Sequence, residues 1–297
     1  MSVADDLRAA CPGLKTQEPL SRHTSLAVGG PADYYADVNS LQELIAIRNI
    51  SQSQRLLVFF LGAGSNLLVS DRGIRGLVIH LQGEFRRIEF KGTYVFAGAG
   101  VMMPTLARQA AERGLSGIES LIGVPGTVGG GLVMNAGTRE GWLGSVVVSV
   151  DVIGNTLKAE TLSSESFGFG YRHSNLEGKW ITGASLALKS EEPASIMKRI
   201  DDLLQYRTRT QPLTTANCGS VFKNPVDGHA AEMIEKAGFK GKAVGGARVS
   251  DRHANFIINE GSATAQDVRD LISQIQKKVE EQFSVRLEPE VKMAGEW

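Results

Sequence analysis

Apolar residues recur along the first half of the chain in short runs rich in valine, isoleucine and phenylalanine. Runs of this kind, bounded by glycine or serine, predict strands; they cover residues 34–38, 55–61, 76–81, 93–98, 145–154 and 181–189. Two helices are expected between them. One begins near Leu41, behind the capping pair Ser40 and Glu43, and one begins at Pro104 and ends at Gly114.

The pattern changes near Pro193, where apolar residues take up helical spacing. A longer helix is predicted over residues 265–283, capped by Thr264 and Asp267. Two further strands are expected on either side of that helix, over residues 254–259 and 286–293. The pattern predicts two domains, 1–193 and 194–297, of which the C-terminal one is a small α+β domain.

Composition narrows the function classes. The 297 residues carry 32 lysines and arginines against 32 aspartates and glutamates, a balance that argues against nucleic acid or a membrane surface as a partner. The longest apolar run, 56–61, is too short to cross a bilayer, and the N-terminus does not look like a signal peptide. Only Cys11 and Cys218 are present, and the five histidines lack ligand spacing. We expect a soluble cytoplasmic protein without a metal site.

Glycine is concentrated in two segments, 62–66 and 123–131. Successive backbone N–H groups turned toward one point form an anion site, and glycine permits the turns that this requires. Tight hairpins at the edge of a β domain are the alternative interpretation. A Rossmann site is disfavoured, because Leu67 stands where the third glycine of the fingerprint belongs and the residues that follow read as a strand.

Several long motifs resemble the UDP-N-acetylenolpyruvoylglucosamine reductase family, in the same order along nearly the whole chain. They are RHTSLAVGGPADYYA (22–36), LGAGSNLLVSDRGIRGLVI (61–79), GLSGIESLIGVPGTVGGGLVMNAG (114–137), FGYRHS (169–174), GSVFKNP (219–225), GGARVSDRHANFIIN (245–259) and LEPEV (287–291). The short segment between Tyr171 and Arg209 is similar to the branch of the family that lacks the substrate-capping tyrosine loop.

The resemblance implies an α+β fold, with a FAD-binding domain of the vanillyl-alcohol-oxidase type over 1–193, built from two lobes that divide near residue 54, and a smaller substrate-binding domain over 194–297. It implies reduction of UDP-N-acetylglucosamine enolpyruvate to UDP-N-acetylmuramate in peptidoglycan precursor synthesis, with NADPH as co-substrate. The expected ligand is a UDP-sugar, and no obligate protein partner is evident. The positions that match the cofactor loops are Gly62, Gly64, Ser65, Asn66, Gly123, Gly126, Thr127, Gly129 and Gly130.

The implied reaction places negative charge on the substrate carboxylate and requires a proton at carbon. Arg172 matches the family arginine at the carboxylate, Ser220 the proton donor, and Glu290 the glutamate that polarises the enolpyruvyl group. Tyr171, Lys223 and Asn224 match positions expected to contact the substrate.

The residues taken alone leave other interpretations open. Arg172 could form a surface ion pair and Ser220 a turn. Glu288 would share one strand face with Glu290, so periodicity does not separate the two. After residue 137 the family commonly has Ala-Tyr-Gly, whereas this chain has TREGWLG, so Thr138, Arg139 or Trp142 would replace a tyrosine near the flavin. The rival functions are a different flavin oxidoreductase and a non-catalytic nucleotide-binding protein.

Overall fold

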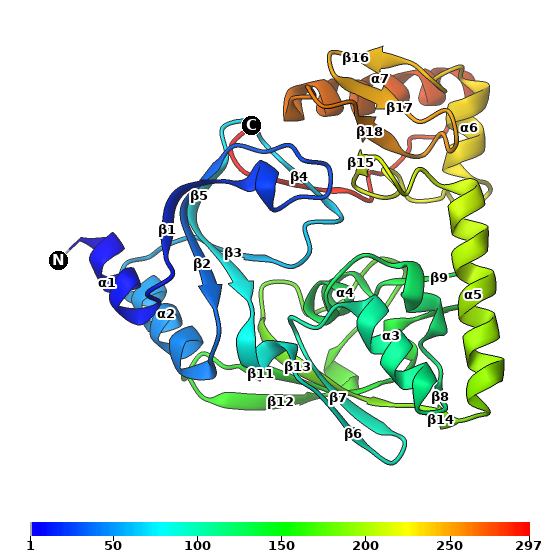
Figure 1. Cartoon of the computed structure of the whole chain (residues 1–297). Coiled ribbons are helices and arrows are strands. Elements are labelled where there is room, and N and C mark those ends of the chain that lie inside the picture. The colour runs from blue at the N-terminus through cyan, green and yellow to red at the C-terminus, as the bar shows by residue number, and fades with distance from the viewer. Residues whose placement is uncertain (1) are drawn as a thin grey trace. The chain divides into compact units, whose positions relative to one another are not determined.

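The computed structural model describes residues 2–297 and divides into two compact units that interleave along the chain (Figure 1). The first contains the chain up to Thr16, Tyr34–Ala63 and Gly76–Gln205; the second contains Gln17–Asp33, Gly64–Arg75 and Tyr206–Trp297. Each has a separate hydrophobic core. Two N-terminal segments therefore fold with the C-terminal residues, a division that differs from a single boundary at residue 193. The functional domains expected at 1–193 and 194–297 stay a prediction.

A five-stranded antiparallel sheet organises the first unit, in the order β12-β11-β13-β7-β6. Its strands are β6 (Ile88–Lys91), β7 (Tyr94–Gly98), β11 (Val147–Ile153), β12 (Ala159–Ser163) and β13 (Trp180–Ala187). Helices α3 (Met103–Glu112) and α4 (Val128–Met134) lie on the same side of this sheet (Figure 1). Short pairs join β8 (Leu115–Ser116) to β14 (Lys189–Ser190), and β9 (Gly137–Thr138) to β10 (Gly141–Trp142).

A second sheet has the order β1-β2-β5-β3, and the limits of the units fall within three of its strands. The strands are β1 (Lys15–Pro19), β2 (Pro31–Val38), β3 (Val58–Leu61) and β5 (Ile74–Leu81), and β3 runs parallel to β5. The accompanying helices are α1 (Val3–Ala10), which the hydrophobic pattern did not predict, and α2 (Leu41–Ser53), which begins behind Ser40 as expected.

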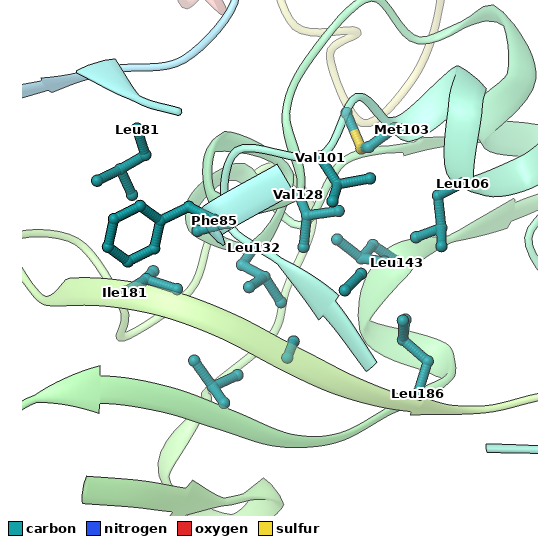
Figure 2. Packing of buried hydrophobic residues seen from close by; sticks show 14 of the residues in the cluster. Leu81, Phe85, Val101, Met103, Leu106, Val128, Leu132, Leu143, Ile181 and Leu186 are labelled. Atoms are coloured by element: carbon teal, nitrogen blue, oxygen red, sulfur yellow. The ribbon is translucent and has the colours of Figure 1, made fainter. Parts of the chain in front are cut away.

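The core of the first unit is closed by α4. Figure 2 shows Val128 and Leu132 of this helix among Val101, Leu143 and Ile181, and all five side chains are buried. Burying a valine or leucine side chain contributes about 1.5–3 kcal/mol each. This packing holds in place a helix with glycine at three of its seven positions.

The second unit is built on the sheet β15-β18-β17-β16, which α7 (Ala265–Phe283) covers (Figure 1). The strands are β15 (Ala216–Asn217), β16 (Ala243–Val244), β17 (Ala247–Val249) and β18 (Ile257–Asn259), and α6 (Ala230–Lys236) packs against α7. A parallel pair joins β4 (Leu67–Val69) to β19 (Lys292–Ala294). Helix α5 (Pro193–Thr210) precedes the sheet in the chain.

The expected helices at 41, 104 and 265–283 are confirmed, including the capping box of Thr264 and Asp267. Two strand predictions are corrected. The strand expected over 254–259 is limited to 257–259, and the strand expected over 286–293 is limited to 292–294. Residues 285–291 make only one isolated bridge, at Pro289. Glu288 and Glu290 therefore do not share the face of a strand.

Candidate active site

The first glycine segment follows β3 as an irregular loop. Gly64 has φ of +63°, a left-handed conformation that favours glycine, and a Cβ there would collide with the backbone carbonyl of His23. The N–H of Ser25 donates to Gly64 O at 3.1 Å. The loop is thus pressed against residues 23–25, and only glycine fits this approach.

The backbone donors of this loop are unclaimed by the protein. Among residues 2–297, no group accepts a hydrogen bond from the N–H of Gly62, Ala63, Gly64, Ser65 or Asn66. Because buried or half-buried N–H groups normally have partners, a row of successive donors in one turn is the signature of an anion site. The loop therefore fits the diphosphate of FAD.

The second glycine segment forms a helix, and the expected alternative of tight hairpins is wrong for its C-terminal half. Thr127 caps α4 through a 3.3 Å bond from Gly130 N to its Oγ1. Gly129 N donates to Ala99 O at 2.8 Å, and a Cβ on Gly131 would lie 2.6 Å from Met103 Sδ. The glycines let α4 approach β7 and α3 closely.

The two segments meet within the first unit. A Cβ on Gly62 would lie 2.6 Å from Thr127 Oγ1, so this residue pair is in direct contact. Gly123 ends the 3₁₀ turn Glu119–Gly123, and Gly126 N donates to Val124 O at 2.9 Å. Of the positions matched to the cofactor, Thr127 is the point where the loops touch.

Arg172 lies at the tip of a tight turn. Gly170 and His173 exchange backbone hydrogen bonds of 3.0 and 3.3 Å, and Arg172 has φ of +53°. A non-glycine residue in this region costs on the order of 1 kcal/mol or more and is typical of functional turns. The guanidinium lies 5.1 Å from the ring centre of Tyr171, which is 58% exposed.

The Arg172 turn is anchored to α4. Asn135, at the C-terminal end of α4, donates from Nδ2 to Gly170 O at 2.9 Å and accepts Gly144 N at Oδ1 at 3.0 Å. Ser174 donates to Val133 O at 2.9 Å. Helix α4 therefore contains glycines at its N-terminal end and is bonded at its C-terminal end to the turn that contains Arg172.

Ser220 belongs to a segment fixed by Asn255. The Asn255 side chain accepts a hydrogen bond from Phe222 N at 2.9 Å and donates one to Phe222 O at 2.8 Å. It thus bonds to both backbone groups of Phe222, as a neighbouring strand would do in a sheet. Asn255 N donates to Nδ1 of His253 at 3.2 Å. Burial and the charge of Lys240 lower the pKa of His253, so the neutral ring can accept this bond.

Glu290 lies beside the segment that contains Ser220 and Val221. Its N–H donates to Val221 O at 2.7 Å, and Asn66 Nδ2 donates to Glu290 O at 3.1 Å. Glu288 is 69% exposed at its side chain and pairs with Lys223 at 2.5 Å. The two glutamates that periodicity left equivalent thus have different surroundings.

Asn224 bonds to the backbone of a helix, and Cys218 is buried. Asn224 Oδ1 accepts the N–H of Ala230, the first residue of α6, at 3.1 Å. Cys218 is buried, and burial raises the pKa of its thiol to about 12. The thiol is therefore neutral and unreactive at physiological pH.

The candidate residues are distributed between the two units. Gly62, Thr127 and Arg172 belong to the first. Ser65, Asn66, Ser220 and Glu290 belong to the second, where a Cβ on Gly219 would lie 3.9 Å from Ser65 O. Asn255 and Ser25 had not been singled out. The Ser25 hydroxyl donates to Asn217 O at 2.6 Å and so ties the glycine loop to the residues before Ser220. Both lie within segments that resemble the family, 22–36 and 245–259, and no other feature of the sequence marks them.

Within residues 2–297 no cluster of three or more histidine, cysteine, aspartate or glutamate side chains could hold a metal ion. None of the described helices is long and apolar enough to span a membrane.

Known proteins match the chain over nearly its full length. One family profile, described as FAD binding domain, matches residues 32–158, and another, UDP-N-acetylenolpyruvoylglucosamine reductase C-terminal domain, matches 211–294. UDP-N-acetylenolpyruvoylglucosamine reductase 2 of Symbiobacterium thermophilum is 46% identical, over 99% of this chain and 97% of that protein. The Moorella thermoacetica reductase is 44% identical, over 95% and 93%. The crystal structure of the Thermus caldophilus reductase aligns with a TM-score of 0.82 and 38% identity, over 93% and 97%.

A FAD-binding domain together with an unclaimed row of backbone donors defines a FAD-dependent oxidoreductase. The identity to the Symbiobacterium protein is more specific: the chain belongs to the UDP-N-acetylenolpyruvoylglucosamine reductase family. The expected family, the α+β fold with a C-terminal domain and FAD as cofactor are thereby confirmed.

Proposed function

We propose that this protein reduces UDP-N-acetylglucosamine enolpyruvate to UDP-N-acetylmuramate for peptidoglycan precursor synthesis, with NADPH as reductant. Bound FAD supplies the hydride chemistry between nicotinamide and substrate, and the protein supplies binding, charge and the proton. The observation that carries the proposal is the 2.7 Å hydrogen bond from Glu290 N to Val221 O. It joins the LEPEV and GSVFKNP motifs at the residue next to Ser220. A cytoplasmic location follows from the proposed reaction, because NADPH and UDP-sugars are cytosolic metabolites.

The two glycine segments have different proposed roles in binding the cofactor. The N–H groups of residues 62–66 are available for the FAD diphosphate, which supports a direct role for Gly62, Gly64, Ser65 and Asn66. Gly129 and Gly130 use their N–H groups within the protein. Their proposed contribution, with Gly123, Gly126 and Thr127, is a surface without side chains that lets the cofactor approach closely.

Reduction of the enolpyruvyl group builds negative charge at the carbon next to the carboxylate. Arg172 is proposed to bind that carboxylate with two parallel hydrogen bonds and to remain charged as the enolate forms. Its left-handed φ supports this role, because strained turns persist where a side chain must be presented.

Ser220 is proposed to give its proton to the enolate carbon, and Glu290 to polarise the enolpyruvyl group as charge builds. A serine is a weak acid, so the alkoxide left behind requires neighbours that stabilise it and that are held rigidly in place. The bonds from Asn255 to the peptide of Phe222 support such rigidity. The pairing of Glu288 with Lys223 on the surface favours Glu290 as the catalytic carboxylate.

Tyr171, Lys223 and Asn224 are proposed as substrate contacts. Lys223 could neutralise the UDP diphosphate by exchanging Glu288 for the ligand, since both side chains can move at low cost in an exposed pair. The Oδ1 atom of Asn224 is engaged by Ala230 N, which leaves its NH₂ group for an acceptor on the substrate.

The test is anaerobic absorption spectroscopy of the purified protein with FAD. NADPH should bleach the flavin band, and UDP-N-acetylglucosamine enolpyruvate should restore it, whereas UDP-N-acetylglucosamine without the enolpyruvyl group should not. Restoration by unrelated alcohols or sugars would instead identify a different flavin oxidoreductase. A colourless protein that takes up no FAD would favour a non-catalytic nucleotide-binding protein.

A further inference from the structure

Hydrogen bonds hold the backbone of Glu290 on both sides of the residue. Its N–H donates to Val221 O at 2.7 Å, and its carbonyl accepts Asn66 Nδ2 at 3.1 Å. Residues 285–291 belong to no strand, so ladder pairing does not orient them. The bonds to Val221 and Asn66 therefore contribute to the direction in which the Glu290 side chain leaves the backbone.

Asn66 binds the same segment twice. Its carbonyl accepts the N–H of Lys292 at 3.1 Å, while its side-chain amide reaches Glu290 O two residues earlier. Its backbone N–H has no acceptor among the described residues. The donor available to an anion on Asn66 is thus the backbone N–H, and the side chain is committed to the residue that bears the candidate carboxylate.

We infer that Asn66 is a positioning residue for Glu290: its side chain fixes the catalytic glutamate, while its backbone serves the cofactor. This inference rests on the proposed function, in which Glu290 acts on the enolpyruvyl group. Asn66 thus links the cofactor loop, through its backbone N–H, to the catalytic carboxylate, through its side chain.

Loss of the Asn66 side chain should slow the reaction because it changes the position of the Glu290 carboxylate. Asn66→Ala removes the hydrogen bond from the Asn66 side chain to Glu290 O, so the peptide that follows Glu290 is held less firmly. A displacement of about 1 Å at a catalytic group can slow a reaction about 100-fold. Asn66→Asp places an oxygen against the carbonyl oxygen and should misplace Glu290 further, because two acceptors repel each other.

The experiment separates three steps: FAD affinity, reduction of bound FAD by NADPH, and reoxidation by UDP-N-acetylglucosamine enolpyruvate. Asn66→Ala should slow reoxidation by about 10- to 100-fold and leave the first two steps nearly unchanged. Asn259→Ala is the matched control, since its amide also donates to a backbone carbonyl of this unit, Leu26 O, at 3.0 Å. The control should lose at least as much stability, because Asn259 Oδ1 also accepts from Gly261 N and Ala263 N, and yet should not slow reoxidation.

A double-mutant cycle with Glu290→Gln provides the decisive comparison. If Asn66 acts through Glu290, Asn66→Ala should slow reoxidation less than about twofold further in the Glu290→Gln background. An equal slowing in both backgrounds would overturn the inference. So would a loss of FAD affinity and of flavin reduction as large as the loss of reoxidation, because that pattern identifies a cofactor ligand.

Different results would be expected if the proposed function itself were wrong. Wild-type flavin would then stay reduced in the presence of the enolpyruvyl substrate, or Glu290→Gln would reoxidise at the wild-type rate, and the inference would fall with it. If Asn66→Ala does not fold, Asn66→Ser carries the test: its shorter hydroxyl donor should recover part of the reoxidation rate, and an unchanged wild-type rate would contradict the inference.

Discussion

Replacing Asn255 by alanine should loosen the catalytic serine segment from a distance in sequence. Asn255 is 4% exposed and satisfies both backbone groups of Phe222, which is 1% exposed. Alanine leaves that N–H and that carbonyl buried without partners. Ser220 lies two residues before Phe222, so the loss acts directly on the proposed proton donor.

The magnitude follows from the two orphaned groups. Each buried backbone group without a partner costs about 1–3 kcal/mol. Relaxation and water entry recover part of this, so the expected loss is about 2–4 kcal/mol, a large share of the 5–15 kcal/mol that typically stabilises a protein. Asn259→Ala, which also removes a side chain bonded to backbone groups, controls for a general loss of stability.

The assay is hydrogen exchange of the peptide that spans residues 219–225, measured with bound FAD, together with the rate of flavin reoxidation. Asn255→Ala should raise exchange in this peptide selectively and slow reoxidation more than flavin reduction by NADPH. Unchanged protection of the Phe222 amide, with a stability change below about 0.5 kcal/mol, would refute the reasoning.

Three further predictions address other parts of the molecule. Gly64→Ala should weaken FAD binding at least about tenfold, since a left-handed alanine costs about 1–2 kcal/mol and its Cβ would meet a backbone carbonyl. The control is Gly92→Ala, because Gly92 has φ of +59° and open space around it, and fluorescence titration measures FAD affinity in both variants. Burial raises the pKa of Glu119, but hydrogen bonds, chiefly from Arg199, outweigh it and hold the pKa below the ordinary 4.5. Glu119 therefore stabilises above that value and loses its contribution as pH falls through the folded pKa. Glu119→Gln should cost about 1 kcal/mol at pH 7 and less at pH 3 in urea unfolding, and an equal cost at both would contradict this. Because burial raises the pKa of Cys218 to about 12, iodoacetamide should alkylate it at pH 8 about a thousandfold more slowly in the native than in the unfolded protein, as peptide mapping can measure; equal rates would show that the thiol is accessible.

Local signals predicted the helices well and the glycine segment poorly. Helix α7 was predicted from Thr264 to Phe283 because its capping box and apolar stripe act between residues close in sequence. Three glycines in α4 each disfavour a helix by about 1 kcal/mol. That helix exists because Val128 and Leu132 are buried, and such tertiary packing has no local signature.

The LEPEV segment failed as a strand for a related reason. Buried Leu287 and Val291 flank exposed or half-buried positions, a pattern typical of a strand. Pro289 has no N–H to donate, and pairing is limited to one bridge with Phe222. The irregular backbone lets Asn66 and Val221 reach the two sides of Glu290.

The candidate site was recognisable by motif, whereas its supporting residues were not. Arg172, Ser220 and Glu290 stand at positions that match the family, but Ser25 and Asn255 act through bonds to backbone far away in sequence. Hydrophobic periodicity carries no information about such bonds. The assignment of Gly64–Asn66 to the second unit likewise depends on long-range packing against residues 23–25 and 290–292.

The central claim is that Ser220 delivers the proton that completes reduction of the enolpyruvyl group. Anaerobic stopped-flow measurement of Ser220→Ala tests it directly, by following the flavin band first with NADPH and then with UDP-N-acetylglucosamine enolpyruvate. We predict flavin reduction at the wild-type rate and formation of UDP-N-acetylmuramate slowed by at least about 100-fold. Wild-type rates in both halves of the reaction would contradict the account.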